Sequence, residues 1–103
     1  MILIGSEQQF YEPGIYELQI DDMNLLLINQ DKQFYLIENK CGHFGTPLSS
    51  GKLKPKEIVC SEHGISFSLE TGQIINRPFE VCDAIKTFNI AKIKGTLYLD
   101  ETS

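Results

Sequence analysis

The first third of the chain shows the hydrophobic patterns of three β-strands. From Ile15 to Ile20 apolar and polar side chains alternate, which predicts a strand with one buried face. Leu25–Ile28 is a continuous apolar run, which is typical of a strand buried on both faces. Gln33–Glu38 has four apolar or aromatic residues at its centre and predicts a third strand. Polar turns at 21–22 and 29–32 join these strands, so we expect an antiparallel meander.

The rest of the chain also favours short strands over helices. Residues 2–4 predict an edge strand, and the polar stretch 6–14 ends in a Glu-Pro-Gly turn signal. Residues 58–60 predict a short strand. Residues 86–93 and 96–99 flank a Lys-Gly turn and predict a final hairpin. No segment has a long helical period, so the sequence predicts an all-β fold.

Between the meander and the final hairpin lie two pairs of metal-binding side chains. Cys41 and His43 form a C-x-H pair, and Cys60 and His63 form a C-x-x-H pair sixteen residues further on. These are the two histidines of the chain and two of its three cysteines. Two thiolates and two imidazoles suffice for one metal centre. Nearby glycines suit loops that fold closely around such a centre.

The wider motif resembles that of the Rieske 2Fe–2S family. The chain reads C-x-H-x-G-x-P-L and then C-x-x-H-G-x-x-F. The resemblance implies one 2Fe–2S cluster, with Cys41 and Cys60 on one iron and His43 and His63 on the other. It also implies a single Rieske domain over residues 1–103.

The fold implied by this resemblance is an antiparallel β sandwich with a small inserted cluster-binding subdomain. We place that subdomain at about residues 41–75. It contains few apolar residues, so we expect it to depend on its metal for stability.

Two other interpretations stay open beside the 2Fe–2S cluster. A Cys2His2 set can hold structural zinc, which would make the chain an interaction module. A structural or regulatory subunit, as in small nitrite reductase subunits, can share the Rieske fold, but those subunits commonly lack the ligands. All four ligand residues are present here.

The resemblance also implies a role in electron transfer. It suggests a one-electron carrier between a flavin-dependent ferredoxin reductase and a terminal oxygenase or other redox acceptor. Both histidines are assigned to the cluster, so a separate site of two histidines and a carboxylate cannot form, and we do not expect an enzyme. The chain also lacks a Gly-rich nucleotide fingerprint.

Composition limits the classes of partner and the cellular compartment that we expect. The 42% hydrophobic and 22% charged residues are ordinary for a globular protein. The net charge of −5 argues against nucleic acid as the main partner. It permits steering toward a basic docking face, and the alternative is that it only keeps the protein soluble. The first residues lack a basic segment, and no apolar run approaches the ~18 residues of a membrane span. We therefore expect a cytoplasmic protein without a membrane segment.

Four positions bear on the reduction potential of the implied cluster. High-potential Rieske proteins of cytochrome bc complexes carry a loop disulfide, and the matching positions here are Thr46 and Glu62. They also place serine and tyrosine hydroxyls near the cluster, where this chain has Ile65 and Phe67. Fewer hydrogen-bond donors and an added carboxylate disfavour reduction. We therefore predict a potential at the low end of the Rieske range.

Three further residues lie between positions 77 and 82, beyond the second pair. In the Rieske family a proline-containing segment covers the cluster, and Pro78 is placed either for that role or for a plain connecting loop. Cys82 matches no ligand position and is interpreted as a small buried hydrophobe. Arg77 is interpreted as a solvated surface residue.

Overall fold

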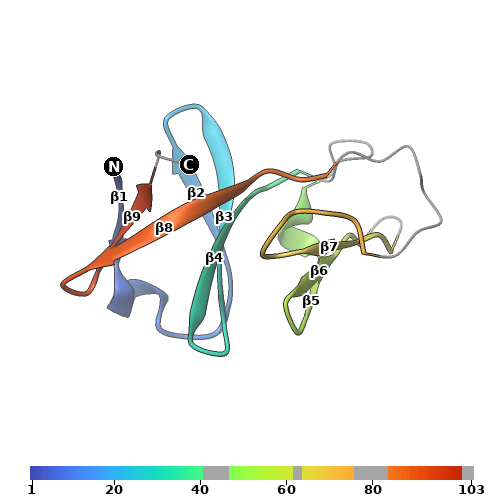
Figure 1. The fold of residues 1–103 in the computed structure, drawn as a ribbon, viewed down its shortest axis with the longest axis horizontal. Coiled ribbons are helices and arrows are strands. Elements are labelled where there is room, and N and C mark those ends of the chain that lie inside the picture. The colour runs from blue at the N-terminus through green and yellow to red at the C-terminus, as the bar shows by residue number, and fades with distance from the viewer. Residues whose placement is uncertain (41–46, 62–63, 76–83, 101–103) are drawn as a thin grey trace.

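The computed structural model describes residues 1–40, 47–61, 64–75 and 84–100. These residues form two antiparallel β-sheets and two short 3-10 helices (Figure 1). The elements are β1 (Ile2–Ser6), η1 (Glu7–Phe10), β2 (Gly14–Ile20), β3 (Met23–Gln30), β4 (Gln33–Glu38), η2 (Leu48–Ser50), β5 (Lys52–Lys54), β6 (Glu57–Val59), β7 (Ser66–Ser68), β8 (Thr87–Ile93) and β9 (Thr96–Asp100). The predicted all-β fold is confirmed.

The larger sheet has six strands in the order β1-β9-β8-β4-β3-β2. The meander β2–β3–β4, the final hairpin β8–β9 and the edge position of β1 all match the predictions. Two paired residues of β4, Leu36 and Ile37, join the meander to β8. One half of this sheet is β1-β9-β8 and the other is β4-β3-β2. Side chains from both halves pack together in one core, which we call the large-sheet core. Its buried members are Phe10, Ile20, Leu25, Leu27, Leu36, Leu97 and Leu99.

Strand β3 is buried on both faces, as its continuous apolar run predicted. Leu25 and Leu27 point into the large-sheet core, and Leu26 and Ile28 point the other way. All four side chains are at most 1% exposed. Successive side chains of a strand face opposite sides, so β3 separates two cores.

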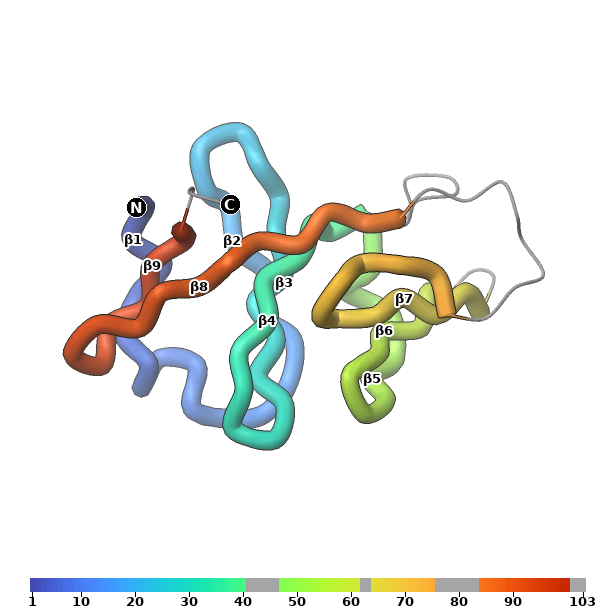
Figure 2. Tube along the Cα trace, in the orientation of Figure 1, coloured from blue at the N-terminus to red at the C-terminus, as the bar shows by residue number. Residues whose placement is uncertain are grey.

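The second core, which we call the inter-sheet core, lies between the large sheet and the three-stranded sheet β5-β6-β7. The chain leaves the large sheet after β4, builds the small sheet and returns through β8 (Figure 2). The buried members of this core are Leu26, Ile28, Ile37, Leu48, Ile58, Cys60, Ile65, Phe67, Leu69 and Ile85.

The segment 41–75 contributes more buried side chains than its few apolar residues suggested. Six members of the inter-sheet core come from the segment 41–75: Leu48, Ile58, Cys60, Ile65, Phe67 and Leu69. Although the segment contains few apolar residues, six of them enter one core, and the expected dependence of the segment on its metal stays a prediction. Its apolar residues are mostly isolated in sequence, so the segment has no long hydrophobic run that would predict a buried strand. The segment packs onto the large sheet rather than standing apart from it.

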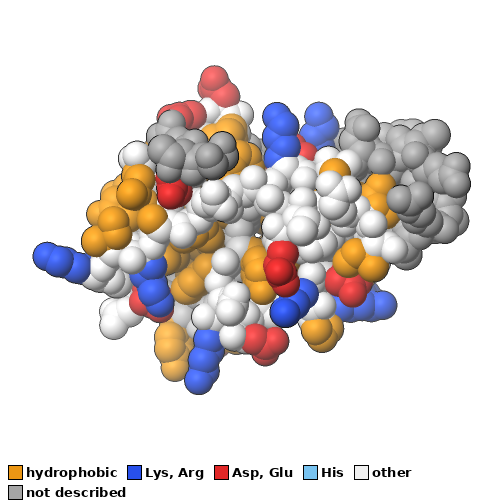
Figure 3. Space-filling view, in the orientation of Figure 1, with side chains coloured by type: hydrophobic (Ala, Val, Ile, Leu, Met, Phe, Trp, Pro, Cys, Tyr) orange, Lys and Arg blue, Asp and Glu red, His pale blue; other side chains and the backbone are white. Residues whose placement is uncertain are grey.

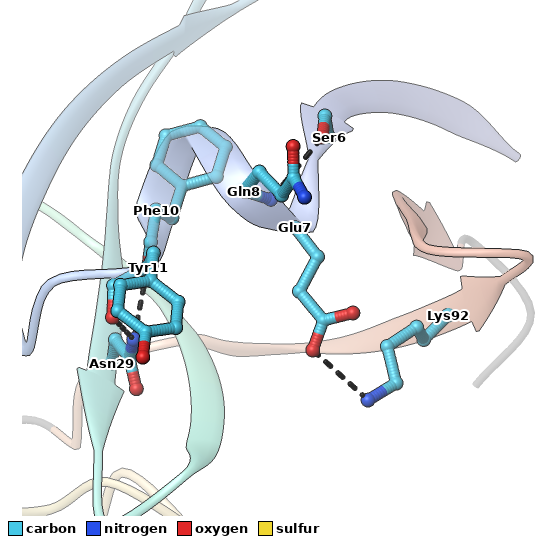
Figure 4. Close-up of polar contacts among 7 residues, drawn as sticks. All are labelled: Ser6, Glu7, Gln8, Phe10, Tyr11, Asn29 and Lys92. Carbon is cyan, nitrogen blue, oxygen red and sulfur yellow. Dashed lines mark hydrogen bonds and ion pairs between the residues drawn. The ribbon is translucent and has the colours of Figure 1, made fainter.

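The polar stretch 6–14 also holds more structure than predicted. Ser6 and Gln9 form a capping box at the start of η1, and Phe10 is buried in the large-sheet core. Asn29, predicted to lie in a turn, belongs to β3 and is 7% exposed. Its Nδ2 donates to the carbonyl oxygens of Phe10 (2.7 Å) and Tyr11 (3.0 Å), which ties η1 to β3 (Figure 4).

In the described part of the chain, no helix has the length and apolar character needed to cross a membrane.

Candidate metal centre

Cys60 is the predicted ligand whose placement the structure describes. It directly follows β6, is 1% exposed and is a free cysteine. The alternation of β6 explains its direction, because Ile58 and Cys60 have the same parity and both enter the inter-sheet core. The thiol is therefore held by packing at the end of a paired strand.

The backbone makes a tight turn directly after Cys60. The Cys60 N–H donates to the Ile65 carbonyl oxygen (2.8 Å), and the Gly64 N–H donates to the Cys60 carbonyl oxygen (3.0 Å). Gly64 has a φ of +67°, a conformation that costs a residue with a side chain roughly 1–2 kcal/mol. These contacts fix both ends of the segment 61–64, which contains His63.

A buried asparagine fixes both ends of the first ligand segment. Asn39 follows β4 and is 7% exposed. Its Oδ1 accepts hydrogen bonds from the N–H groups of Leu48 (2.8 Å) and Ser49 (3.0 Å), the first residues of η2. Residues 40–47, which include Cys41 and His43, therefore start and finish at neighbouring points.

Contacts at the end of η2 bring the two ligand segments together. The hydroxyl groups of Ser50 and Ser61 are 3.1 Å apart and share a hydrogen bond. Gly51 lies so close to β6 that an added Cβ would be 2.5 Å from the Val59 carbonyl oxygen. The absence of a side chain at Gly51 thus allows η2 to approach the strand that leads to Cys60.

A third connection lies at the return to the large sheet. The Ile85 N–H donates to the Gly72 carbonyl oxygen (2.9 Å), and a Cβ on Gly72 would collide with the Ile85 carbonyl oxygen. The chain from 73 to 84 therefore begins and ends at one place. Pro78, Arg77 and Cys82 belong to this stretch but lie outside the described residues.

The other three predicted ligands, Cys41, His43 and His63, also lie outside the described residues. Within the described ranges, no group of three His, Cys, Asp or Glu side chains forms a metal site.

The structure describes two of the four positions predicted to affect the reduction potential. Ile65 and Phe67 are 0% exposed and share the inter-sheet core with Cys60. Thr46 and Glu62 lie outside the described residues.

Comparison with known proteins identifies the family. The family model of the Rieske [2Fe-2S] domain matches residues 1–91 of the 103-residue chain. The chain belongs to the Rieske [2Fe-2S] domain family. Membership implies a 2Fe–2S cluster as the cofactor, in agreement with the resemblance of the Cys/His motif.

Relatives of this Rieske domain include short proteins and one much longer protein. The 3-phenylpropionate/cinnamic acid dioxygenase ferredoxin subunit of Escherichia coli (strain K12) is 31% identical over 85 residues, which cover 81% of this chain and 78% of the relative. Apoptosis-inducing factor 3 of Homo sapiens is 28% identical over 83 residues. That match covers 81% of this chain but only 13% of the human protein's length.

A solved structure has the same fold. It is the complex of reduced oxygenase and oxidized ferredoxin in carbazole 1,9a-dioxygenase, in which one chain matches with a TM-score of 0.80 and 26% identity. The match covers 96% of this Rieske domain and 100% of that chain.

The described residues of this Rieske domain fit a 2Fe–2S cluster. Cysteine thiolate is a ligand that such clusters require, and Cys60 is free and held rigidly by its neighbours. Sequence reasoning missed Asn39 and Gly51, because each acts on a backbone group far from it along the chain. No residue pattern in the sequence marks either contact.

Proposed function

We propose that the protein is a one-electron carrier with one Rieske-type 2Fe–2S cluster held by Cys41, His43, Cys60 and His63. When bound, the cluster supplies reversible one-electron chemistry. The chain's own residues hold the two ligand segments in place and pack apolar side chains beside Cys60. We expect no catalytic role for the protein on its own.

One observation carries this proposal more than any other. The two Cys/His segments are far apart in sequence, yet the Ser50–Ser61 hydrogen bond and the close approach of Gly51 to Val59 bring their described ends together. Four ligands of one metal centre need such convergence. Family membership then favours the cluster over structural zinc.

The proposed partners are a flavin-dependent reductase as electron donor and a terminal oxygenase as acceptor. The relative from E. coli is a ferredoxin subunit of a dioxygenase, which supports the acceptor. The similar chain from the complex of reduced oxygenase and oxidized ferredoxin supports it further. The proposal of a reductase as electron donor rests on the resemblance of the sequence to Rieske-type ferredoxins.

Visible absorption and low-temperature EPR spectra, recorded before and after dithionite, test the proposal. We expect a red-brown protein whose reduced form gives an average g value below that of all-cysteine clusters. Cys60→Ser should abolish or strongly alter that signal, whereas Cys82→Ser is the matched control and should keep it. A colourless protein with stoichiometric zinc would overturn the electron-transfer proposal and favour the interaction module.

A further inference from the structure

Asn39 is a polar residue buried at the start of the first ligand segment. Its Oδ1 accepts two hydrogen bonds from backbone N–H groups, those of Leu48 at 2.8 Å and Ser49 at 3.0 Å. We propose that Asn39 is a positioning residue for the cluster, which closes the segment 40–47 so that Cys41 and His43 are presented to the metal. This inference rests on the proposed function, since it assumes that those two residues are ligands.

The two N–H groups that Asn39 satisfies begin the short helix η2. The first N–H groups of a helix have no partner within it and are usually satisfied by the preceding residue's side chain. Here that residue is Pro47, which makes no side-chain capping bond. Asn39 supplies the acceptor instead, from nine residues upstream of Leu48. The hydrogen bonds therefore set the separation of the segment's two ends.

Asn39 is itself fixed to the large sheet. Its backbone N–H donates to the Asn24 carbonyl oxygen (2.9 Å), next to the paired strands β3 and β4. Its Nδ2 lies 3.4 Å from Glu17 Oε1, a long contact with an exposed carboxylate. The short bonds are those that Oδ1 accepts, so the carbonyl oxygen of the side chain carries the proposed role.

The same anchor connects to the second ligand segment. Leu48 is 0% exposed and belongs to the inter-sheet core together with Cys60. Two residues further on, Ser50 shares a hydrogen bond with Ser61, the neighbour of Cys60. Loss of the Asn39 bonds would therefore loosen η2 and, through it, the relative position of the two Cys/His pairs.

Asn29 offers a matched control. It is also 7% exposed, and its side chain also makes two hydrogen bonds to backbone groups distant in sequence. Those bonds hold Phe10 and Tyr11 against β3 and do not involve the ligand segments (Figure 4). Asn29→Ala and Asn39→Ala should thus lower the melting temperature alike, and only Asn39→Ala should affect the cluster.

The experiment follows the decay of visible absorption of the loaded protein with excess chelator, at one temperature well below every variant's melting point. Losing buried hydrogen bonds should make cluster loss about tenfold faster in Asn39→Ala. Asn29→Ala should stay within about twofold of the wild type. Asn39→Asp combined with Glu17→Gln keeps the acceptor oxygens and replaces the Glu17 carboxylate, which would repel the new charge, with an amide that can donate, so this pair should restore the wild-type rate. Reduced EPR lines should broaden in Asn39→Ala alone.

Equal decay rates for the two alanine variants would overturn the proposal, as would failure of Asn39→Asp/Glu17→Gln to restore the rate. If Asn39→Ala does not fold, Asn39→Ser takes its place in the same comparison, with an intermediate rate expected from its shorter hydroxyl. A wild-type protein without a 2Fe–2S spectrum would instead contradict the proposed function itself. The two failures are therefore distinguishable.

Discussion

Ile65 and Phe67 are apolar residues that share a core with Cys60. Both side chains are 0% exposed and belong to the inter-sheet core. The potential of an iron–sulfur centre rises when hydrogen bonds to its sulfurs stabilise the more negative, reduced state. Neither side chain can donate such a bond. This chemistry supports a low reduction potential for the proposed cluster.

We predict that the wild-type potential lies toward the −150 mV end of the Rieske range, which extends to about +300 mV. Phe67→Tyr adds a hydroxyl at the position where high-potential Rieske proteins carry a tyrosine near the cluster. It should raise the potential by roughly 20–60 mV, because one hydrogen bond contributes about 0.5–1.5 kcal/mol and 59 mV corresponds to tenfold for one electron. Phe34→Tyr makes the same change at the large-sheet core and should leave the potential unaltered. Protein-film voltammetry measures all three. A wild-type midpoint well above zero would contradict the argument.

Single residues show where sequence reasoning reached its limit. The proposed ligand residues stood out because cysteine and histidine in close pairs have few other uses. Asn39 did not stand out, because its importance depends on η2 returning to it after nine residues. Gly51 did not stand out either, and only the approach of Val59 shows why a side chain is excluded. Such roles need coordinates, since backbone partners leave no mark in a sequence.

At the scale of elements, the small sheet is fastened to the large sheet by a side chain at the end of β3. Gln30 Nε2 donates to the Lys54 carbonyl oxygen (2.8 Å), and the Lys56 N–H donates to Gln30 Oε1 (2.7 Å). Lys56 also accepts at its carbonyl oxygen a bond from the Leu69 N–H (3.0 Å). The β5–β6 turn is therefore held from two sides.

Gln30→Ala should remove this connection and loosen the β5–β6 turn while the large sheet stays intact. Loss of the hydrogen bond from the Lys56 N–H to Gln30 Oε1 predicts roughly tenfold faster amide exchange at Lys56. Amides of β8 and β9 should exchange at wild-type rates. Hydrogen exchange followed by NMR measures both regions, and Gln33→Ala at the exposed start of β4 serves as the control. Unchanged exchange at Lys56 in Gln30→Ala would show that packing alone holds the turn.

The strands themselves were largely predictable from the sequence. Period-two alternation marked β2, a continuous apolar run marked β3, and polar turns bounded both, so local patterns sufficed. The helix η1 was missed because its first residues are polar and its capping box is a local side-chain arrangement. The pairing of β1 with β9 joins the two ends of the described chain. No local pattern specifies such a distant partner.

Charge is distributed unevenly over the molecule as a whole. Residues 40–86 contain six of the nine Lys and Arg and five of the fourteen Asp and Glu, so their net charge is +1 and that of the remaining residues is −6. Lys40 and Lys86 are exposed, and both line a surface hollow with Pro47 and Phe88 at the start of the first ligand segment. Lys92 and Lys94 lie on and after β8, toward the opposite end (Figure 1).

This distribution matters because the molecule is long compared with the range of screened charge. Its extents are 42 × 25 × 19 Å, whereas the Debye length at 0.1 M salt is about 10 Å. Basic side chains occur on the visible face both beside the ligand segments and at the far end (Figure 3). A charged redox reagent that approaches the cluster should therefore sense the nearby lysines and not the net charge of −5.

Oxidation of the reduced protein by ferricyanide, an anion, tests where electrons leave. The double variants Lys40→Gln/Lys86→Gln and Lys92→Gln/Lys94→Gln lower the net charge equally, so net charge alone predicts equal slowing. If electrons leave beside Lys40 and Lys86, the first variant should react roughly three- to tenfold more slowly at low salt, and the second should stay near the wild type. Stopped-flow absorption measures the rates.

The difference between the two double variants should vanish at about 1 M salt, where the screening length is about 3 Å. Equal slowing in both variants would show that the distribution of charge does not guide the approach.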